Sequence, residues 1–224
     1  MLNREYYSRQ VGLIDPDKLR LNILVVGAGS IGSWTSLALL KLGCQNVTVI
    51  DFDDVGEENI GSQIYSSYDI GKWKVKAFKE KAELLVETSP KIIVNPVNDA
   101  NTIPPNIYDI VISAVDNMQA RKDVFKQLNP SPAWFLDGRM AANNVQLFAT
   151  KMDNPDQVSF YDSTLFSSED AMPIACSERS VVYNCFVIAG LLTDLVAKIA
   201  NGKVPPKELI VDLENLTMFG GLDS

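Results

Sequence analysis

Histidine is absent from the 224-residue sequence. Without it, the chain cannot form a histidine-based catalytic triad, a histidine-ligated metal site or an imidazole proton relay. Cysteine is scarce, because the three cysteines, Cys44, Cys176 and Cys185, include no CxxC pair, which excludes a four-thiolate zinc site. An odd number of cysteines also argues against a disulfide framework. The composition therefore favours a reducing, cytoplasmic setting.

Basic residues are outnumbered, and long apolar runs are missing. Twenty lysine and arginine residues face twenty-eight aspartate and glutamate residues, and the net charge of −8 argues against a general nucleic-acid-binding surface. The N-terminal segment 1–20 has no apolar signal core, and the apolar stretch around 187–195 is interrupted by Gly190 and Asp194. We therefore predict no nucleic-acid partner, no secretion signal and no membrane span. With 46% apolar residues and no repeat or linker, residues 1–224 are predicted to form a single domain.

Strand-like and helix-like patterns alternate through the first part of the chain. An apolar run at 22–26, a helical pattern at 30–42 and a strand-like segment at 46–52 make a βαβ unit. A helix, two strands, a helix and a strand are then predicted at about 71–87, 91–97, 109–113, 117–127 and 133–136. The alternation predicts an α/β fold with a Rossmann-like, doubly wound, mostly parallel sheet, whose ligand lies at the carboxyl ends of the strands. The nucleotide-binding half would cover about residues 1–140.

The later part of the chain changes character. Residues 144–150 and 157–162 alternate like antiparallel strands, and a polar loop is predicted over about 163–180. A strongly apolar helix is expected over 181–200, followed by a short terminal hairpin made of 208–212 and 215–219. We therefore expect antiparallel strands in the C-terminal part of the sheet.

A glycine motif marks a nucleotide site. Gly27, Gly29 and Gly32 form GxGxxG between a buried strand and a helix, where backbone amides can approach a phosphate. Asp51 ends the next strand, where a carboxylate can accept hydrogen bonds from both ribose hydroxyls of an adenosine. The alternative is that the glycines only pack the helix against the strand. The motif predicts an adenine nucleotide and leaves NAD and ATP open.

Segments beyond Asp51 resemble a known family. VIDFDDVGEENIGSQ resembles the D-x-D-x-V-…-N-x-x-R-Q signature of the ThiF/MoeB/HesA family, the bacterial relatives of ubiquitin-activating enzymes. DIGKWKVKA resembles the family's G-x-x-K segment, SAVDN its D-N segment and YYSRQVGL its R-Y-x-R-Q segment. The matches keep the family's order from Arg9 to Asn117, and a fainter match continues through the apolar helix after Cys176.

The resemblance implies an activity. Such enzymes use ATP and Mg²⁺ to adenylate the C-terminal carboxylate of a ubiquitin-like or sulfur-carrier protein, and most are dimers. It therefore implies an ATP-dependent adenylyltransferase that acts as a homodimer on such a carrier protein or on a peptide. Charge stabilisation matters more than a general base when a carboxylate attacks a phosphate, so the missing histidine is no handicap.

The resemblance also assigns roles to individual residues. Lys74 would contact the phosphates and Asp116 would hold Mg²⁺. Asp51 would bind the ribose, while Asn59 and Gln63 would line the nucleotide pocket. Lys74 could instead belong to a solvated helix face, since lysines surround it. Asp116 could equally cap the following helix.

Two further positions follow from the resemblance. Arg9 would reach the γ-phosphate region of the other subunit as an arginine finger in trans, although it could also be an ordinary surface arginine. Asp53 would orient the loop after the second strand.

One position departs from the family pattern. Ser62 stands where the family usually has the arginine of N-x-x-R-Q, which removes a cation from the triphosphate site. Either another arginine substitutes, with Arg121 and Arg139 as candidates, or activity is weakened.

The segment PIACSERS, which contains Cys176, matches in outline the place where some family members carry an acyl-accepting cysteine. The resemblance makes Cys176 a candidate for thioester formation or sulfur transfer, and a semi-exposed structural cysteine is the alternative. Cys44 and Cys185 are predicted to lie in the core.

Two other functions compete with the adenylating enzyme. An NAD-dependent oxidoreductase would explain GxGxxG and Asp51 but not Asn59, Gln63, Lys74 and Asp116. A catalytically weak dimer partner or scaffold would explain Ser62.

Overall fold

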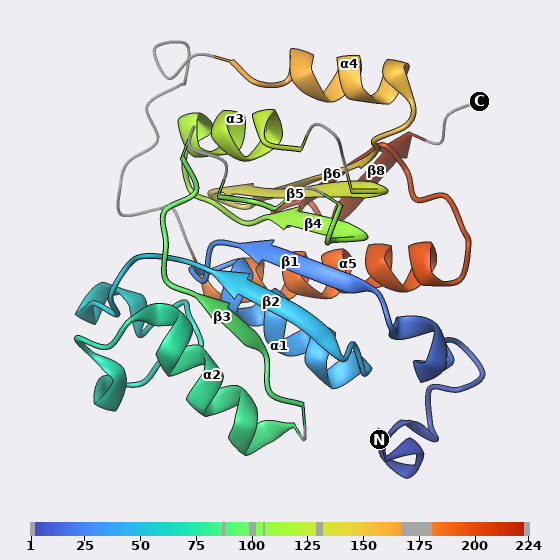
Figure 1. Ribbon diagram of the computed structural model, residues 1–224. Coiled ribbons are helices and arrows are strands. Elements are labelled where there is room, and N and C mark those ends of the chain that lie inside the picture. Colours follow the sequence, from blue (N-terminus) through green and yellow to red (C-terminus); the bar gives the residue numbers. More distant parts are fainter. Residues whose placement is uncertain are drawn as a thin grey trace.

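The chain forms one eight-stranded sheet with the strand order β3-β2-β1-β4-β5-β6-β7-β8 (Figure 1). The structure, a computed structural model, describes residues 3–86, 88–98, 102–104, 106–128, 132–166 and 181–221. The strands are β1 (Asn22–Val26), β2 (Asn46–Ile50), β3 (Lys91–Ile93), β4 (Ile110–Ser113), β5 (Trp134–Ala141), β6 (Asn144–Lys151), β7 (Glu208–Asp212) and β8 (Thr217–Gly221). Strands β3 to β5 pair in parallel, whereas β5 to β8 pair antiparallel. The predicted fold class is confirmed.

Helices cover both faces of the sheet (Figure 1). One face carries α1 (Gly32–Leu42), α2 (Lys74–Leu85) and α5 (Val182–Ala200), and the other carries α3 (Met118–Lys126) and α4 (Pro155–Ser163). Short 3₁₀ turns η1 (Arg4–Tyr7) and η2 (Pro16–Leu19) precede β1, and η3 (Glu57–Asn59) and η4 (Ser67–Asp69) lie between β2 and α2.

Alternation along β1 explains the two cores. Ile23 and Val25 are fully buried against the α1 and α5 face, while Leu24 and Val26 join the smaller core under α3 and α4. Because successive side chains of a strand point to opposite faces, a strand buried on both faces must be apolar throughout. This is why 22–26 reads as an unbroken apolar run.

The prediction of a strand at 157–162 is wrong, because this segment lies within α4. Asn154 caps the helix by accepting hydrogen bonds from the backbone N–H groups of Asp156 and Gln157, and Pro155 occupies the first turn. Gln157 and Tyr161, four residues apart, are buried together on one face, as helical spacing requires. The alternation over six residues is too short to distinguish the two periods.

Helix α5 is long and apolar enough to cross a membrane by length and composition alone. In this fold it packs against α1, β5 and β6, and Cys185, Ile188 and Leu192 are buried there. Core helices of globular domains share this composition. The predicted terminal hairpin is present as β7 and β8, with β8 beginning at Thr217 instead of residue 215.

Candidate functional site

The glycine loop between β1 and α1 combines one constrained part with one open part. Gly27 has φ +98°, and a Cβ there would lie 2.7 Å from the carbonyl oxygen of Ala114. A Cβ on Gly32 would lie 1.8 Å from the carbonyl oxygen of Gly27. At Gly29, by contrast, the nearest heavy atom among the described residues is Nε2 of Gln63 at 4.0 Å. Packing therefore requires the outer two glycines, whereas the middle one leaves room for a ligand beside the backbone.

Asp51 fastens this loop to the segment after β2. Its carboxylate accepts hydrogen bonds from the N–H groups of Ala28 at 2.6 Å and Asp53 at 2.7 Å. Burial raises the pKa of Asp51, while these two amides and the charge of Lys74 act against that rise. The buried Tyr65 hydroxyl donates to the carbonyl oxygen of Ala28 at 2.7 Å, a support for the loop that no sequence motif signalled.

Lys74 does not belong to a solvated helix face. It is the first residue of α2 and is only 8% exposed. Its ammonium group lies 2.8 Å from the carboxylate of Asp53, and its backbone N–H donates to the carbonyl oxygen of Asp53 at 2.9 Å. Neighbouring lysines pair with other carboxylates: Lys72 with Glu80, Lys79 with Glu83 and Lys81 with Asp69. Asp53 thus orients Lys74. The positive charge of Lys74 also favours the ionised form of Asp51.

The 3₁₀ turn η3 and the residues after it supply two of the predicted pocket residues, Asn59 and Gln63. Asn59 accepts a hydrogen bond from the N–H of Gly56 at 2.9 Å, which holds the turn together. Gln63 lies beside Gly29, and its buried Oε1 has no hydrogen-bond partner among the described residues. An unsatisfied buried acceptor is costly and points to a donor on a bound molecule.

Ser62 closes onto the glycine loop. Its hydroxyl oxygen lies 3.0 Å from that of Ser30, and its carbonyl oxygen accepts a hydrogen bond from the indole of Trp34 at 2.9 Å. Ser62 is 8% exposed, so this position contributes a small neutral group in contact with the loop.

Asp116 lies just beyond β4 at the carboxyl edge of the sheet. The cap of α3 is Asn117, whose side-chain oxygen accepts from the N–H of Ala120 at 2.8 Å. Asn117 also donates to one carboxylate oxygen of Asp116 at 3.0 Å. Capping therefore does not require Asp116, which is exposed to solvent.

Arg9 lies at the other end of α1. The side chain of its neighbour Gln10 donates to the carbonyl oxygen of Leu42, the last residue of that helix, at 2.6 Å. The glycine loop is at the first turn of the same eleven-residue helix, roughly 16 Å away at 1.5 Å per residue. The N-terminal segment and the arrowheads of β1 and β2 lie at opposite ends of the sheet (Figure 1). Arg9, which is exposed, is therefore remote from the glycine loop of its own chain.

Neither arginine considered as a substitute at position 62 is free. Arg121 donates from Nε to Asp137 at 3.2 Å, and Arg139 donates from Nε to the other oxygen of Asp137 at 2.7 Å. The hydroxyl of Tyr161 also donates to Asp137 at 3.0 Å. Among the described residues, both guanidinium groups are thus engaged by the fully buried carboxylate of Asp137.

The structure confirms that Cys44 and Cys185 lie in the core. Cys44 and Cys185 are fully buried, and burial raises the pKa of the Cys44 thiol to about 12, which keeps it protonated. Cys176 and most of the predicted loop 163–180 lie outside the described residues.

The residues fit a magnesium nucleotide better than a protein-only metal site. No group of three or more His, Cys, Asp or Glu side chains could hold a metal within the part of the chain that the structure describes. Mg²⁺ is commonly held by one or two carboxylates together with substrate phosphates, so a single carboxylate such as that of Asp116 would suffice from the protein. The open backbone at Gly29, the unpartnered Oε1 of Gln63 and the ammonium of Lys74 fit a nucleotide.

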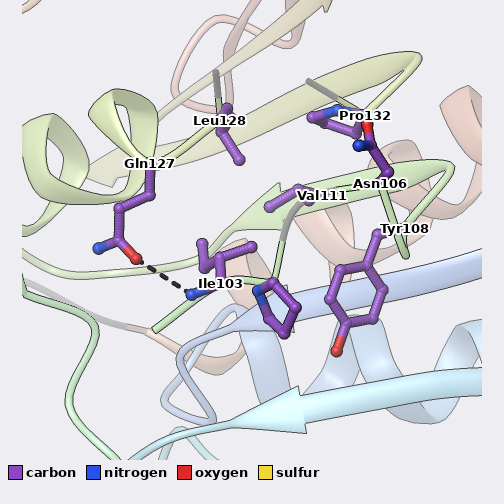
Figure 2. A pocket seen from close by; sticks show the side chains of 8 residues that line it. Ile103, Asn106, Tyr108, Val111, Gln127, Leu128 and Pro132 are labelled. Carbon is purple, nitrogen blue, oxygen red and sulfur yellow. Dashed lines mark hydrogen bonds between the residues drawn. The ribbon is translucent and has the colours of Figure 1, made fainter. Parts of the chain in front are cut away.

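Two cavities lie away from this site. A space of about 10 Å³ beside α3 is lined by Ile103, Tyr108, Val111 and Leu128, and Oε1 of Gln127 accepts from the N–H of Ile103 at 3.1 Å (Figure 2). It is large enough for one water molecule at most. A second cavity of about 450 Å³ lies at the amino ends of β1 and β2, the edge opposite the glycine loop.

Comparisons with known proteins identify the family of the chain. The model of the ThiF family matches residues 7–219. The chain is 35% identical over 137 residues to the tRNA threonylcarbamoyladenosine dehydratase of Haemophilus influenzae, covering 54% of this chain and 51% of that protein. It is 26% identical over 203 residues to the molybdopterin-synthase adenylyltransferase of the same organism, covering 87% of this chain and 76% of that protein. The chain thus spans about half the length of the first relative.

A solved structure shows the same fold. The crystal structure of selenomethionine PaaA superposes with a TM-score of 0.77 at 21% identity, covering 97% of this chain and 82% of that one. The family match extends over nearly the whole chain, from the N-terminal segment into β8. From its sequence and its fold, the chain belongs to the ThiF family.

Proposed function

We propose that the chain uses ATP to adenylate the C-terminal carboxylate of a ubiquitin-like or sulfur-carrier protein or of a peptide. The observation that carries this proposal is the buried Lys74 ammonium, held by Asp53 and close to Asp51 at the carboxyl edge of the sheet. An NAD-dependent enzyme binds the adenosine ribose through a carboxylate after the second strand and needs no fixed cation there. A triphosphate does, because charge builds on its oxygens during reaction.

The reaction balances without a proton transfer. A carboxylate oxygen of the substrate attacks the α-phosphorus of ATP, the bond from that phosphorus to the pyrophosphate oxygen breaks, and an acyl adenylate and pyrophosphate result. Lys74 stabilises negative charge on the phosphate oxygens, and the backbone at Gly29 lies alongside them. Asp116 would hold Mg²⁺, which supplies further charge stabilisation when bound.

The relatives differ in their substrates, and charge favours a protein or peptide for this chain. One relative is named for a modified tRNA nucleoside and the other for a protein, molybdopterin synthase. A net charge of −8 opposes the binding of tRNA, whose phosphates attract basic surfaces. The alignment with the adenylyltransferase also covers more of this chain, 87% against 54%.

Calorimetric titration with Mg-ATP and, separately, with NAD tests the proposal. We expect the protein to bind Mg-ATP, and Asp116→Ala to weaken that binding, because a metal ligand is lost. Asp123→Ala, which removes a carboxylate from within α3, the helix that follows Asp116, serves as the control. NAD binding that is indifferent to Asp116→Ala would contradict the proposal and support an oxidoreductase.

We further propose a homodimer in which Arg9 contacts the nucleotide of the partner chain. Its position at the far end of α1 supports this, since Arg9 is remote from its own glycine loop. We expect Arg9→Ala and Lys74→Ala each to be inactive in ATP–pyrophosphate exchange. A 1:1 mixture should regain about a quarter of wild-type activity, because half of randomly assembled dimers are mixed and each contains one intact site.

The mixing experiment needs subunit exchange, which is checked by tagging one variant and purifying through the tag. If exchanged mixtures stay inactive, or if Arg9→Ala alone retains activity, the trans contact is wrong.

A catalytically weak partner of an active enzyme is the second candidate. Ser62 in place of the arginine favours it, because Arg121 and Arg139 are both engaged by Asp137. Such a protein would bind Mg-ATP but would show no ATP–pyrophosphate exchange with any carrier protein. Transfer of the acyl group to Cys176 stays a prediction.

A further inference from the structure

The buried carboxylate of Asp137 is bound from three elements. Asp137 lies in β5 and is fully buried, yet it receives hydrogen bonds from Arg121 of α3, Arg139 of β5 and Tyr161 of α4. Two guanidinium groups face one carboxylate, so the cluster keeps a net positive charge. Aromatic rings enclose it, and the guanidinium of Arg139 lies 4.4 Å from the ring centroid of Phe148.

Stability alone does not account for this cluster. Removing charges from water costs several kcal/mol per ion, and buried ion pairs are often no more stable than apolar residues of the same volume. The side chains around Asp137 are largely aromatic, since Phe125, Phe135, Phe148 and Tyr161 pack against one another there. The guanidinium of Arg139 also donates to the hydroxyl and the carbonyl oxygen of Thr164. What the charges add is a fixed direction for each arginine.

A second nitrogen of the Arg121 side chain donates to the backbone beside Asp116. Its Nη2 donates to the carbonyl oxygen of Val115 at 2.7 Å and to that of Gly138 at 3.3 Å. Val115 directly precedes Asp116, and this segment has left the sheet, since β4 ends at Ser113. The hydrogen bond from Arg121 therefore holds the exposed segment that carries Asp116.

We propose that Asp137 is a positioning residue, which orients Arg121 so that Val115 and hence the Asp116 carboxylate are fixed for Mg²⁺. The inference rests on the proposed function, because it assigns Asp116 to the metal. Arg139 and Tyr161 support Asp137 from its other side, and neither contacts Val115. Groups that orient a metal ligand commonly change metal affinity about 10- to 100-fold when mutated.

The test measures ATP binding by calorimetry with excess Mg²⁺ and with EDTA. The ratio of the two affinities is the magnesium enhancement. We expect Asp137→Asn to lower this enhancement about tenfold while leaving ATP affinity in EDTA unchanged. Tyr161→Phe removes a hydrogen bond to the same carboxylate but does not touch Arg121. It should lower the melting temperature and keep the wild-type enhancement.

Asp137→Asn can fail to fold, because it leaves the buried Arg121 and the partly buried Arg139 without their counter-charge. Arg121→Lys then carries the test, since it keeps the charge but lacks the forked donors that reach Asp137 and Val115 together. It should show the same loss of enhancement. If a folded variant of Asp137 or Arg121 shows the wild-type magnesium enhancement, this inference is wrong and the proposed function is unaffected. A wild-type protein that binds no ATP in either buffer overturns the proposed function and this inference with it.

Discussion

Lys74→Met should reduce ATP–pyrophosphate exchange by about a hundredfold to a thousandfold, the range found when one preorganised charge-stabilising donor is removed. Methionine fills nearly the same volume and keeps the start of α2, so the loss would be one of charge. The ion pair with Asp53 is lost as well, but Asp53 is half exposed and its solvation limits the effect on stability.

Lys76→Met is the matched control for this prediction. Lys76 lies two residues further along α2 and is exposed. Its replacement removes the same charge from the same helix, so net charge and helix composition change equally in the two variants. Equal losses of exchange in both would show that Lys74 acts only through the general field of the helix.

Gly29→Ala should weaken nucleotide binding without loss of stability, whereas Gly32→Ala should destabilise the fold. At Gly29 an added methyl group meets only the side chain of Gln63, at 4.0 Å, so we expect a folded protein with a melting temperature near that of the wild type. Its affinity for Mg-ATP should fall about tenfold or more, about 1.4 kcal/mol, because the methyl group occupies the space where a phosphate would approach.

At Gly32 the added Cβ would lie 1.8 Å from the carbonyl oxygen of Gly27, so the loop or the helix has to shift. We expect this variant to lose several kcal/mol of stability, because steric strain in a closely packed backbone is strongly destabilising. Thermal denaturation and calorimetry on both variants separate the two effects. A Gly29→Ala protein that binds Mg-ATP normally would mean that the motif only packs helix against strand.

Local signals predicted most of the fold and the residues of the glycine loop. The apolar run of β1, the glycine motif and the position of Asp51 each act within a short segment, where residue type dictates conformation. Helix α4 also has a local signal, because Asn154 and Pro155 are typical of a helix start. The alternation at 157–162 nevertheless led to the wrong prediction of a strand. Six residues are too few to separate the helical period of about 3.6 residues from the strand period of two.

The buried network around Asp137 could not be predicted in this way. Its members come from α3, β5 and α4, and their partnership depends on how these elements pack. From the sequence, Arg139 was only a candidate to replace the arginine missing at position 62. The sequence could not show that Asp137, two residues earlier, would engage both arginines considered as substitutes at position 62. Tyr65 is a similar case, since a tyrosine that supports a loop has no motif of its own.

The position of β1 in the sheet also bears on how the chain folds during synthesis. Strand β1 pairs with β2 on one side and with β4 on the other, and the N–H of Asn22 is bonded to Asp109, 87 residues later. Until β4 has emerged from the ribosome, one edge of β1 stays unpaired, and the apolar face of Leu24 and Val26 stays uncovered until α3 and α4 follow. Such unpaired strand edges slow folding and promote aggregation. A chain stopped before β4 would therefore be a substrate for chaperones, however well its glycine loop is formed.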